Sequence, residues 1–226
     1  MKAKWGAFVT DGRGKIGGHV ASKNRGGAYF RTKVTPTNPQ TASQSEARAR
    51  LAAFSQAWSG LTEEQRQAWN SAVNAWNSSN VFGDAVVPSG KELFTRLNAN
   101  TNLIGGTLLS VPPLHVAVTV PEISGLAIDV SSTALEFAFA NASAGQTMVV
   151  EATAPQSAGT YNPSGRFRVI KTIAQTTPAT EDVWTEYVAK FGAPVAGQKV
   201  FIRVKAIVNA TGQNTPYESL SAIVAA

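Results

Sequence analysis

The feature that most constrains the fold of this chain is a run of strict alternation near its carboxyl end. Apolar side chains occupy every second position of residues 199–208, at Val200, Ile202, Val204, Ala206 and Val208. Successive side chains of a β-strand point to opposite faces of a sheet, so this period predicts a strand with one face in a hydrophobic core.

Shorter runs with similar alternation occur elsewhere from residue 121 onward. Further strands are expected at residues 126–130, 135–139, 148–152, 167–173, 183–189 and 220–224. About seven short strands in this region indicate an antiparallel β-sandwich of the immunoglobulin or fibronectin type III kind. The chain contains no cysteine, so such a domain lacks the disulfide of antibody domains.

A helical period governs residues 41–106. Thr41 or Ser43 can cap a first helix, which runs to about Ser59 and ends at Gly60. This helix is expected to present one apolar face, formed by Ala47, Leu51, Phe54 and Trp58.

Two capping boxes mark the helices that follow. Thr62 with Gln65 opens the second, and Ser89 with Glu92 opens the third, which runs to about Ile104. The second helix presents Trp69, Val73 and Trp76. Three short amphipathic helices predict a small bundle, and the proline-containing residues 107–120 predict an extended linker.

Residues 1–40 differ from the rest of the chain in charge. They hold eight Lys and Arg side chains and a single acid, Asp11, so they carry +7 whereas the whole chain carries +6. The residues after Gln40 therefore sum to −1. The basicity belongs to one segment.

Seven glycines also fall in this segment, interleaved with aromatic side chains. Short β-type runs are expected at residues 7–10, 18–22 and 28–34, separated by glycine-rich turns. A narrow ribbon of this kind has no core and is marginal in water. We therefore expect this extended basic arm to become ordered against another subunit.

Composition excludes several classes of function. The absence of cysteine removes disulfides, cysteine nucleophiles and thiolate metal sites. No stretch reaches the ~18 apolar residues that span a bilayer, and the basic start lacks the apolar run of a signal peptide, so we expect a soluble protein made in a cytoplasm. Only 15% of the residues are charged, and an uncharged polar surface costs less to bury against a neighbouring subunit.

Residues that could carry catalysis are scarce. Gly12, Gly14 and Gly17 satisfy the G-x-G-x-x-G pattern, but no helix is expected at Gly17 and no acid follows about 20 residues later, as dinucleotide binding requires. These glycines are interpreted as turns. The two histidines, His19 and His115, lie in the basic arm and in the linker. We expect no catalytic residue, cofactor or metal, and hence no enzyme.

The motifs of residues 12–106 also resemble a known arrangement. The segments NPQTASQSEARAR, LTEEQRQAW and SGKELFTRLNAN follow one another in this chain. They resemble the NPxT, LTxxQRxAW and SG…F…N elements of small structural proteins of tailed bacteriophages and prophages, which often also carry a β-sandwich. The matching positions look like helix caps and core: Asn38, Pro39, Thr41, Gln44, Arg48, Trp58, Leu61, Thr62, Gln65, Arg66, Trp69, Gly90, Phe94 and Asn98.

The sequence therefore predicts a multidomain α+β protein. Its expected parts are an extended basic β-ribbon arm (1–40), a small three-helix bundle (41–106), a linker (107–120) and an immunoglobulin or fibronectin III-like antiparallel β-sandwich (121–226). The resemblance implies a non-enzymatic structural role in a virion, as a capsid-decoration, minor capsid, neck or tail protein.

The expected partners are other virion proteins, in a homo-oligomer or another symmetric assembly, with no membrane and no small-molecule substrate. The residues expected to contact a partner are those of the arm: Lys2, Lys4, Trp5, Phe8, Arg13, Lys15, Lys23, Arg25, Tyr29, Phe30, Arg31 and Lys33.

Two alternatives remain open. The cations and aromatic rings of the arm could contact nucleic acid, including packaged nucleic acid without sequence preference, through phosphates and base stacking. The β-sandwich could instead act as a host-surface adhesin. Its aromatic candidates are Tyr161, Trp184 and Tyr187, although packing is the more frequent role of such rings.

Overall fold

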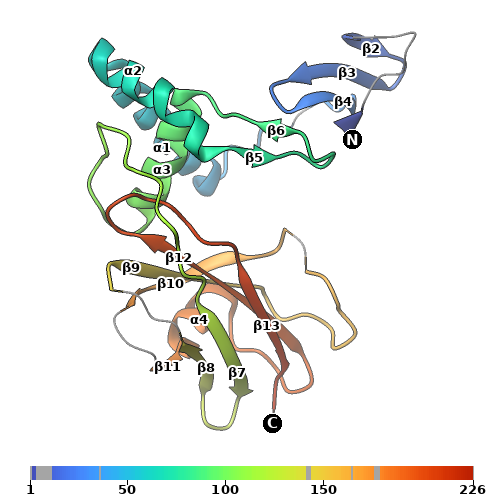
Figure 1. Cartoon of the computed structure of the whole chain (residues 1–226). Helices are drawn as coiled ribbons and strands as arrows, with labels where there is room; N and C mark the ends of the chain where they lie inside the picture. Colours follow the sequence, from blue (N-terminus) through green and yellow to red (C-terminus); the bar gives the residue numbers. More distant parts are fainter. Residues whose placement is uncertain are drawn as a thin grey trace. The chain divides into compact units, whose positions relative to one another are not determined.

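The computed structural model describes residues 2–3, 12–35, 37–140, 144–163, 165–175 and 179–225. The chain divides into two compact units, the first of Met1–Arg96 with Leu109–Pro112 and the second of Leu97–Leu108 with Pro113–Ala226 (Figure 1). Helices and antiparallel sheets both occur, which confirms the α+β class. The segment boundaries expected after residues 40, 106 and 120 stay predictions.

The first unit begins with a four-stranded antiparallel sheet in the order β1-β4-β3-β2. Its strands are β1 (Lys2–Ala3), β2 (Gly14–Ile16), β3 (His19–Asn24) and β4 (Gly27–Thr32). The runs expected at 18–22 and 28–34 correspond to β3 and β4, whereas the run at 7–10 lies outside the described residues. The sequence did not predict β2, because glycines flank its short run and hide any alternation.

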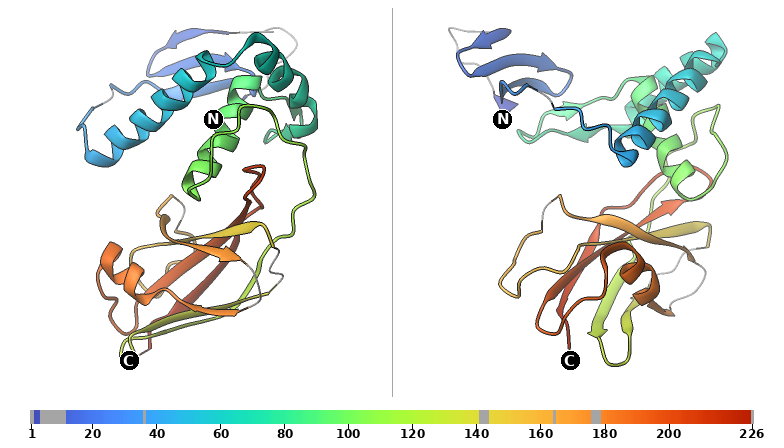
Figure 2. Two further views of the ribbon diagram at one scale, coloured as in Figure 1. Left: turned by 90° about the vertical axis from the view of Figure 1, so that its left-hand side faces the viewer. Right: turned by 180° about the vertical axis from the view of Figure 1, so that it is seen from behind.

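Three α-helices follow at the predicted positions: α1 (Ala42–Ser59), α2 (Glu63–Ala72) and α3 (Gly90–Leu103). A short 3-10 helix (Val73–Trp76) continues α2, and a small hairpin of β5 (Ser78–Ser79) and β6 (Ala85–Val86) precedes α3. Figure 2 shows these elements from two further sides.

The predicted caps are confirmed. Thr62 Oγ1 accepts a hydrogen bond from Gln65 N at 3.3 Å, and Gln65 Oε1 accepts one from Thr62 N at 2.9 Å. Ser89 and Glu92 form the same box at the start of α3, with Glu92 Oε2 2.6 Å from Ser89 N. Thr41 caps α1. Each cap satisfies a backbone N–H that a helix start leaves unpaired, so these starts are specified locally.

Aromatic rings hold the helices together. Phe94 of α3 meets Trp58 and Trp69 edge to face, with ring centroids 5.4 Å apart in both pairs. Trp69 is fully buried, and its Nε1 donates a hydrogen bond to the Ser110 carbonyl oxygen at 3.0 Å. Edge-to-face rings contribute beyond their buried area, so this cluster is the centre of the small core.

The apolar face expected for α1 packs only at the carboxyl end of the helix. Phe54 is buried and Trp58 is half-buried, but residues 42–53 are exposed throughout. Ala47 and Leu51 therefore do not pack against other helices, contrary to the expectation from their spacing.

The second unit contains two antiparallel sheets. One has the order β11-β8-β7, with β7 (Glu122–Asp129), β8 (Ala134–Ala140) and β11 (Ala179–Asp182). The other has the order β10-β9-β12-β13, with β9 (Gln146–Ala152), β10 (Arg168–Gln175), β12 (Lys199–Val208) and β13 (Glu218–Ile223). Both sheets contribute to one core, which includes Leu135, Phe137, Met148, Val150, Ile202 and Val204. The alternation of β12 is confirmed.

The strand expected at residues 183–189 is wrong, because this segment forms the helix α4 (Trp184–Phe191). Trp184, Tyr187, Val188 and Phe191 follow a helical period and pack against the core. The helix contacts β8 and β10 of the same unit (Figure 2). The edge strand β11, immediately before it, was not expected.

The second unit also includes the last turns of α3. Asn100 Nδ2 donates a hydrogen bond to the Gly212 carbonyl oxygen at 2.9 Å, in the loop between β12 and β13. Gly212 has a φ of +67°, and a Cβ built there would overlap the carbonyl oxygen of Leu97. The close approach of these two backbones requires glycine.

Candidate subunit-contact surface

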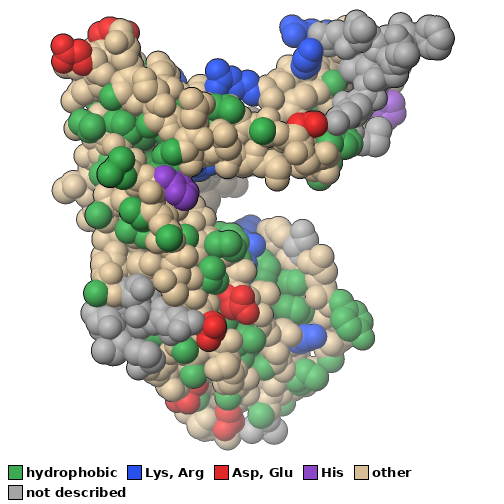
Figure 3. Space-filling view, viewed as in Figure 1, with side chains coloured by type: hydrophobic (Ala, Val, Ile, Leu, Met, Phe, Trp, Pro, Cys, Tyr) green, Lys and Arg blue, Asp and Glu red, His purple; other side chains and the backbone are tan. Residues whose placement is uncertain are grey.

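The strand register of the N-terminal sheet separates its side chains into two faces. Lys15 pairs with Val20, and Val20 pairs with Arg31, so both cations lie on one face. Lys33 continues the β4 ladder, because its N–H donates to Gly18 O at 2.8 Å, and it shares that face with Tyr29. All three cations are exposed. Figure 3 shows a few Lys and Arg side chains near one end of this sheet.

The opposite face carries Ile16, Ala21, Ala28 and Phe30, together with Lys23. Among the described residues of the sheet, only Ala21 and Ala28 are buried. Two alanines remove little apolar surface from water, so the sheet gains little stability from its own packing.

Arg25 lies in the turn between β3 and β4 and faces the residues before α3. Its Nη1 lies 3.4 Å from the Val87 carbonyl oxygen. The pKa of the Glu92 carboxyl is lowered from its usual value, mainly by the backbone N–H of Ser89, with a smaller contribution from Arg25. Arg25 thus contacts groups of its own unit and does not belong to the face that carries Lys15, Arg31 and Lys33.

The remaining residues predicted to contact a partner lie in β1, just before β2, or outside the described residues. Lys2 lies in β1, opposite Tyr29. Arg13 is exposed just before β2. Lys4, Trp5 and Phe8 lie outside the described residues.

The glycine motif at the start of the chain forms turns. Gly14 begins β2, and Gly17 with Gly18 connects β2 to β3, with a φ of +56° at Gly17. No helix begins at Gly17, so the arrangement needed to hold a pyrophosphate at a helix start is missing there. His115 Nε2 lies 3.2 Å from the amide nitrogen of Gln213, in a contact that positions the linker.

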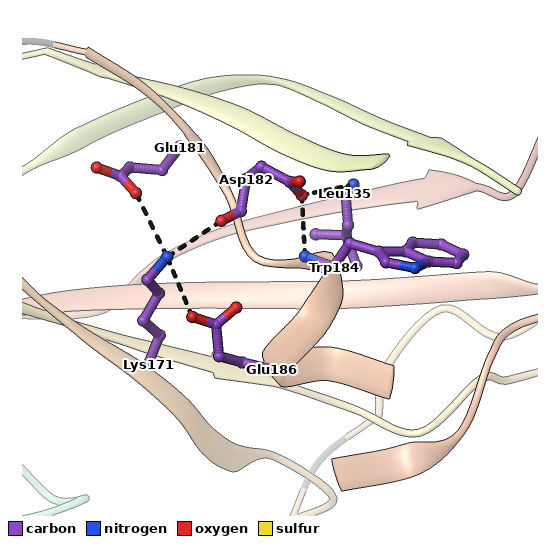
Figure 4. A network of polar contacts seen from close by, with 6 residues as sticks. All are labelled: Leu135, Lys171, Glu181, Asp182, Trp184 and Glu186. Atoms are coloured by element: carbon purple, nitrogen blue, oxygen red, sulfur yellow. Dashed lines mark hydrogen bonds and ion pairs between the residues drawn. The ribbon is translucent and has the colours of Figure 1, made fainter. Parts of the chain in front are cut away.

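Acidic side chains of the second unit make contacts that join its strands and its helix (Figure 4). Lys171 Nζ of β10 lies 3.7 Å from Glu181 and 3.2 Å from Glu186, and donates to the Asp182 carbonyl oxygen. The Asp182 carboxylate accepts hydrogen bonds from the backbone N–H groups of Leu135 and Trp184 at 3.0 and 2.9 Å. These contacts join β8, β10, β11 and the start of α4.

The aromatic adhesin candidates differ in exposure. Tyr187 is fully buried, and its hydroxyl donates to the Thr153 carbonyl oxygen at 3.0 Å. Burial raises its pKa far above the usual value. Trp184 packs against the core. Tyr161, by contrast, is 92% exposed.

The sequence did not predict a set of stacked cations and rings on β12, here named the cation–aromatic ladder. It consists of Lys199, Phe201, Arg203 and Lys205 from β12, with Glu151, Tyr161, Phe167 and Tyr217. In the sequence, the outward positions of the alternating β12 run indicate these side chains. The residues that contact them, however, are remote in sequence.

At the centre of the ladder, Arg203 forms an ion pair with Glu151. Its Nη2 and Nε lie 2.5 and 2.7 Å from Glu151 Oε2. The guanidinium lies 4.2 Å from the Phe167 ring centroid and 4.0 Å from that of Tyr217, so it is stacked between two rings. The Tyr217 hydroxyl donates to Glu151 Oε1 at 3.0 Å.

Burial alters the ionisation of two members of the ladder. It raises the pKa of Tyr217, and the nearby Glu151 carboxylate raises it further. Burial lowers the pKa of Lys205, against the opposing effect of Glu151. Both shifts follow from moving polar groups toward a less polar environment on the outer face of the sheet.

Two absences hold for the part of the chain that the structure describes. None of their helices combines the length and hydropathy needed to cross a bilayer. None of their His, Asp and Glu side chains gather in groups of three or more that could hold a metal ion. Comparison of the chain with protein-family models, with curated proteins and with solved structures found no match.

Proposed function

We propose that this protein is a non-enzymatic structural component of a tailed-bacteriophage virion, attached to another subunit through its N-terminal sheet and helices. The observation that carries the proposal is the uneven charge of that sheet: Lys15, Arg31 and Lys33 share one face, whereas Lys23 lies on the other. The sheet itself buries little apolar surface. An acidic surface on a neighbouring virion protein would supply both countercharge and burial.

The exposed first two thirds of α1 support the same proposal. Residues 42–53 form three turns of helix whose side chains are all exposed, among them Leu51. Helices are marginal in water without packing of an apolar face, so a partner that covers Leu51 would stabilise these turns. The tailed-phage class comes from the resemblance of residues 12–106, in which motif positions such as Thr62 and Gln65 form a helix cap and Trp69 belongs to the aromatic cluster.

We infer further that the second unit is a fibronectin III-like β-sandwich. In chain order, its three-stranded sheet holds the first, second and fifth strands and its four-stranded sheet holds the rest. The two sheets share one core, as in Greek-key sandwiches. The Tyr187 hydroxyl, in the connection before β12, bonds to a backbone carbonyl in the manner of a tyrosine corner.

The test is incorporation into particles of the phage or prophage that encodes the chain. Purified, nuclease-treated particles should contain the protein by mass spectrometry. The double variant Lys15→Glu/Arg31→Glu should lose incorporation, because it reverses the charge of the contact face. Arg168→Glu/Lys190→Glu makes the same charge change at exposed positions of the second unit and should incorporate normally.

Absence of the wild-type protein from intact particles would refute the virion role. Equal incorporation of the two double variants would refute the contact face. Binding of the isolated protein to DNA separates the nucleic-acid alternative. If the sheet contacts phosphates, DNA affinity falls steeply with added salt and is lost in Lys15→Glu/Arg31→Glu, whereas a protein-binding face shows neither effect.

A further inference from the structure

We infer that the cation–aromatic ladder forms one wall of a binding site for a neutral pyranose oligosaccharide. The site is a shallow pocket of about 390 Å³ on the outer face of the four-stranded sheet. Its lining includes Tyr161, Asn162, Phe167, Tyr217, Ser219 and Ser221. The inference goes beyond the virion role and holds whether or not that role is correct.

The wall that contains Tyr161 is positioned by its loop. Gln156 pairs with Lys199 through two backbone hydrogen bonds of 2.8 and 2.9 Å, which bring the loop back to β12. The Arg166 guanidinium contacts the Gln156 side-chain oxygen. Lys199 Nζ then lies 5.7 Å from the Tyr161 ring centroid. These contacts hold the loop that carries Tyr161 against β12, although the Tyr161 side chain is 92% exposed.

The exposure of Tyr161 points to a ligand with an apolar face. A large aromatic ring left in water keeps its hydrophobic surface unburied, and tyrosine adds little conformational cost on binding because it has few rotatable bonds. The C–H face of a pyranose ring is flat and weakly polar, and it can pack on such a ring. Tyr217, 41% exposed, offers a second ring in the same pocket.

The polar groups of the pocket favour a ligand rich in hydroxyls. Asn162, Ser219 and Ser221 are exposed and line the pocket with an amide and two hydroxyls. These groups both donate and accept hydrogen bonds, as sugar hydroxyls do. Ser219 and Ser221 lie on β13 opposite Arg203 and Phe201, so the strand register places them beside the ladder.

The cations of the ladder are already engaged, which argues against a phosphate chain as ligand. Arg203 is neutralised by Glu151 and stacked between two rings. Lys199 lies over Tyr161 and Phe201, and Lys205 lies over a Tyr217 ring 5.2 Å away. Binding a nucleic acid here would require cations that point toward the ligand.

The test titrates the full-length protein with maltohexaose, cellohexaose and chitohexaose, followed by NMR chemical shifts and calorimetry. At least one of these probes should bind with a Kd between about 10 μM and 1 mM. Tyr161→Ala should weaken binding at least tenfold, and Ser219→Ala/Ser221→Ala should weaken it severalfold. Leu114→Ala is the matched control, because Leu114 is 85% exposed in the same unit but does not line the pocket.

Three results would overturn the inference. The first is no response to any of the three oligosaccharides at about 10 mM, tenfold above the weakest expected Kd. The second is binding that Tyr161→Ala and Leu114→Ala affect equally. The third is binding of the single-stranded oligonucleotide (dT)20 that is lost in Tyr161→Ala, which would make the pocket a nucleic-acid site. Amide exchange of β12 in each variant checks that the unit remains folded.

Discussion

Replacing Arg203 by Met should destabilise the second unit more than replacing its partner Glu151 by Gln. The Glu151 side chain is 9% exposed, whereas that of Arg203 is 29% exposed. Without Arg203 the carboxylate remains buried and keeps the Tyr217 hydroxyl as a donor. Without the Glu151 charge, the guanidinium can still reach water. The two halves of one ion pair therefore have unequal costs of removal.

The expected magnitudes follow from these contacts. Removing one partner of a buried ion pair typically costs about 3–5 kcal/mol. Arg203→Met also removes two ring contacts, each of which contributes about 0.5–1 kcal/mol when partly exposed. Because water reaches part of Arg203, the lower end of the ion-pair range applies, and with the two ring contacts we expect about 4–5 kcal/mol. For Glu151→Gln, which keeps the shape and one hydrogen bond, we expect about 1–2 kcal/mol.

The assay must report on the second unit alone. Four of the five tryptophans belong to residues 1–96, so total fluorescence would mix the two units. Hydrogen exchange by mass spectrometry, measured on peptides of β9 and β12 at increasing urea, gives the free energy of unfolding locally.

Arg203→Lys is the matched control for that measurement. It retains the charge but loses the planar group between Phe167 and Tyr217, and should cost about 1–2 kcal/mol. The reasoning is refuted if Glu151→Gln costs as much as Arg203→Met, or if both cost less than about 1 kcal/mol, which is the range of a solvated surface pair.

Two further predictions concern a glycine and a cap. Gly212→Ala should cost about 2 kcal/mol or more, because its φ of +67° is strained for alanine and the new Cβ would overlap the Leu97 carbonyl oxygen. Gly197→Ala, with a φ of +83° and open space, should cost only about 1 kcal/mol, and equal losses in urea unfolding would contradict the role of the close approach. Glu92→Ala should cost about 0.5–1 kcal/mol at neutral pH, because it removes half of a capping box. The folded pKa of Glu92 is lowered chiefly by the Ser89 N–H, so this contribution is present above the unfolded pKa and is lost as the pH falls through the folded value; a pH-independent loss would contradict it.

The helices of the first unit were predictable because their signals are local. Thr62 and Gln65 are three residues apart, as are Ser89 and Glu92, and each pair closes its own capping box. The exposure of residues 42–53 of α1 was not predictable. Periodic spacing shows which side of a helix is apolar, but it does not show whether a neighbouring element covers Leu51.

The segment 183–189 shows how a short apolar run can mislead. Val183 and Tyr187 are compatible with either a strand or a helix over so few residues. The helix is favoured by contacts made at its start: the Asp182 carboxylate accepts from the Trp184 N–H and from the Leu135 N–H of β8. Such a tertiary contact has no signature in the segment itself.

The cation–aromatic ladder was hidden for the same reason. Arg203 and Glu151 are 52 residues apart, and Tyr217 and Glu151 are 66 residues apart. The alternation of β12 shows that Arg203 points away from the core, but the strand order that places β9 and β13 on either side of it depends on the whole unit. Contacts that depend on strand register therefore could not be predicted from the sequence.

The register of the N-terminal sheet has a consequence for how its sequence can change over evolution. Lys15, Arg31 and Lys33 share a face only because their strands keep a two-residue period. Point substitutions would lower the charge one step at a time. A single-residue insertion or deletion within β4 would transfer the side chains beyond it to the opposite face at once. We expect homologues to vary in which cations they carry there, but to preserve the length of β4 and of the turns on either side.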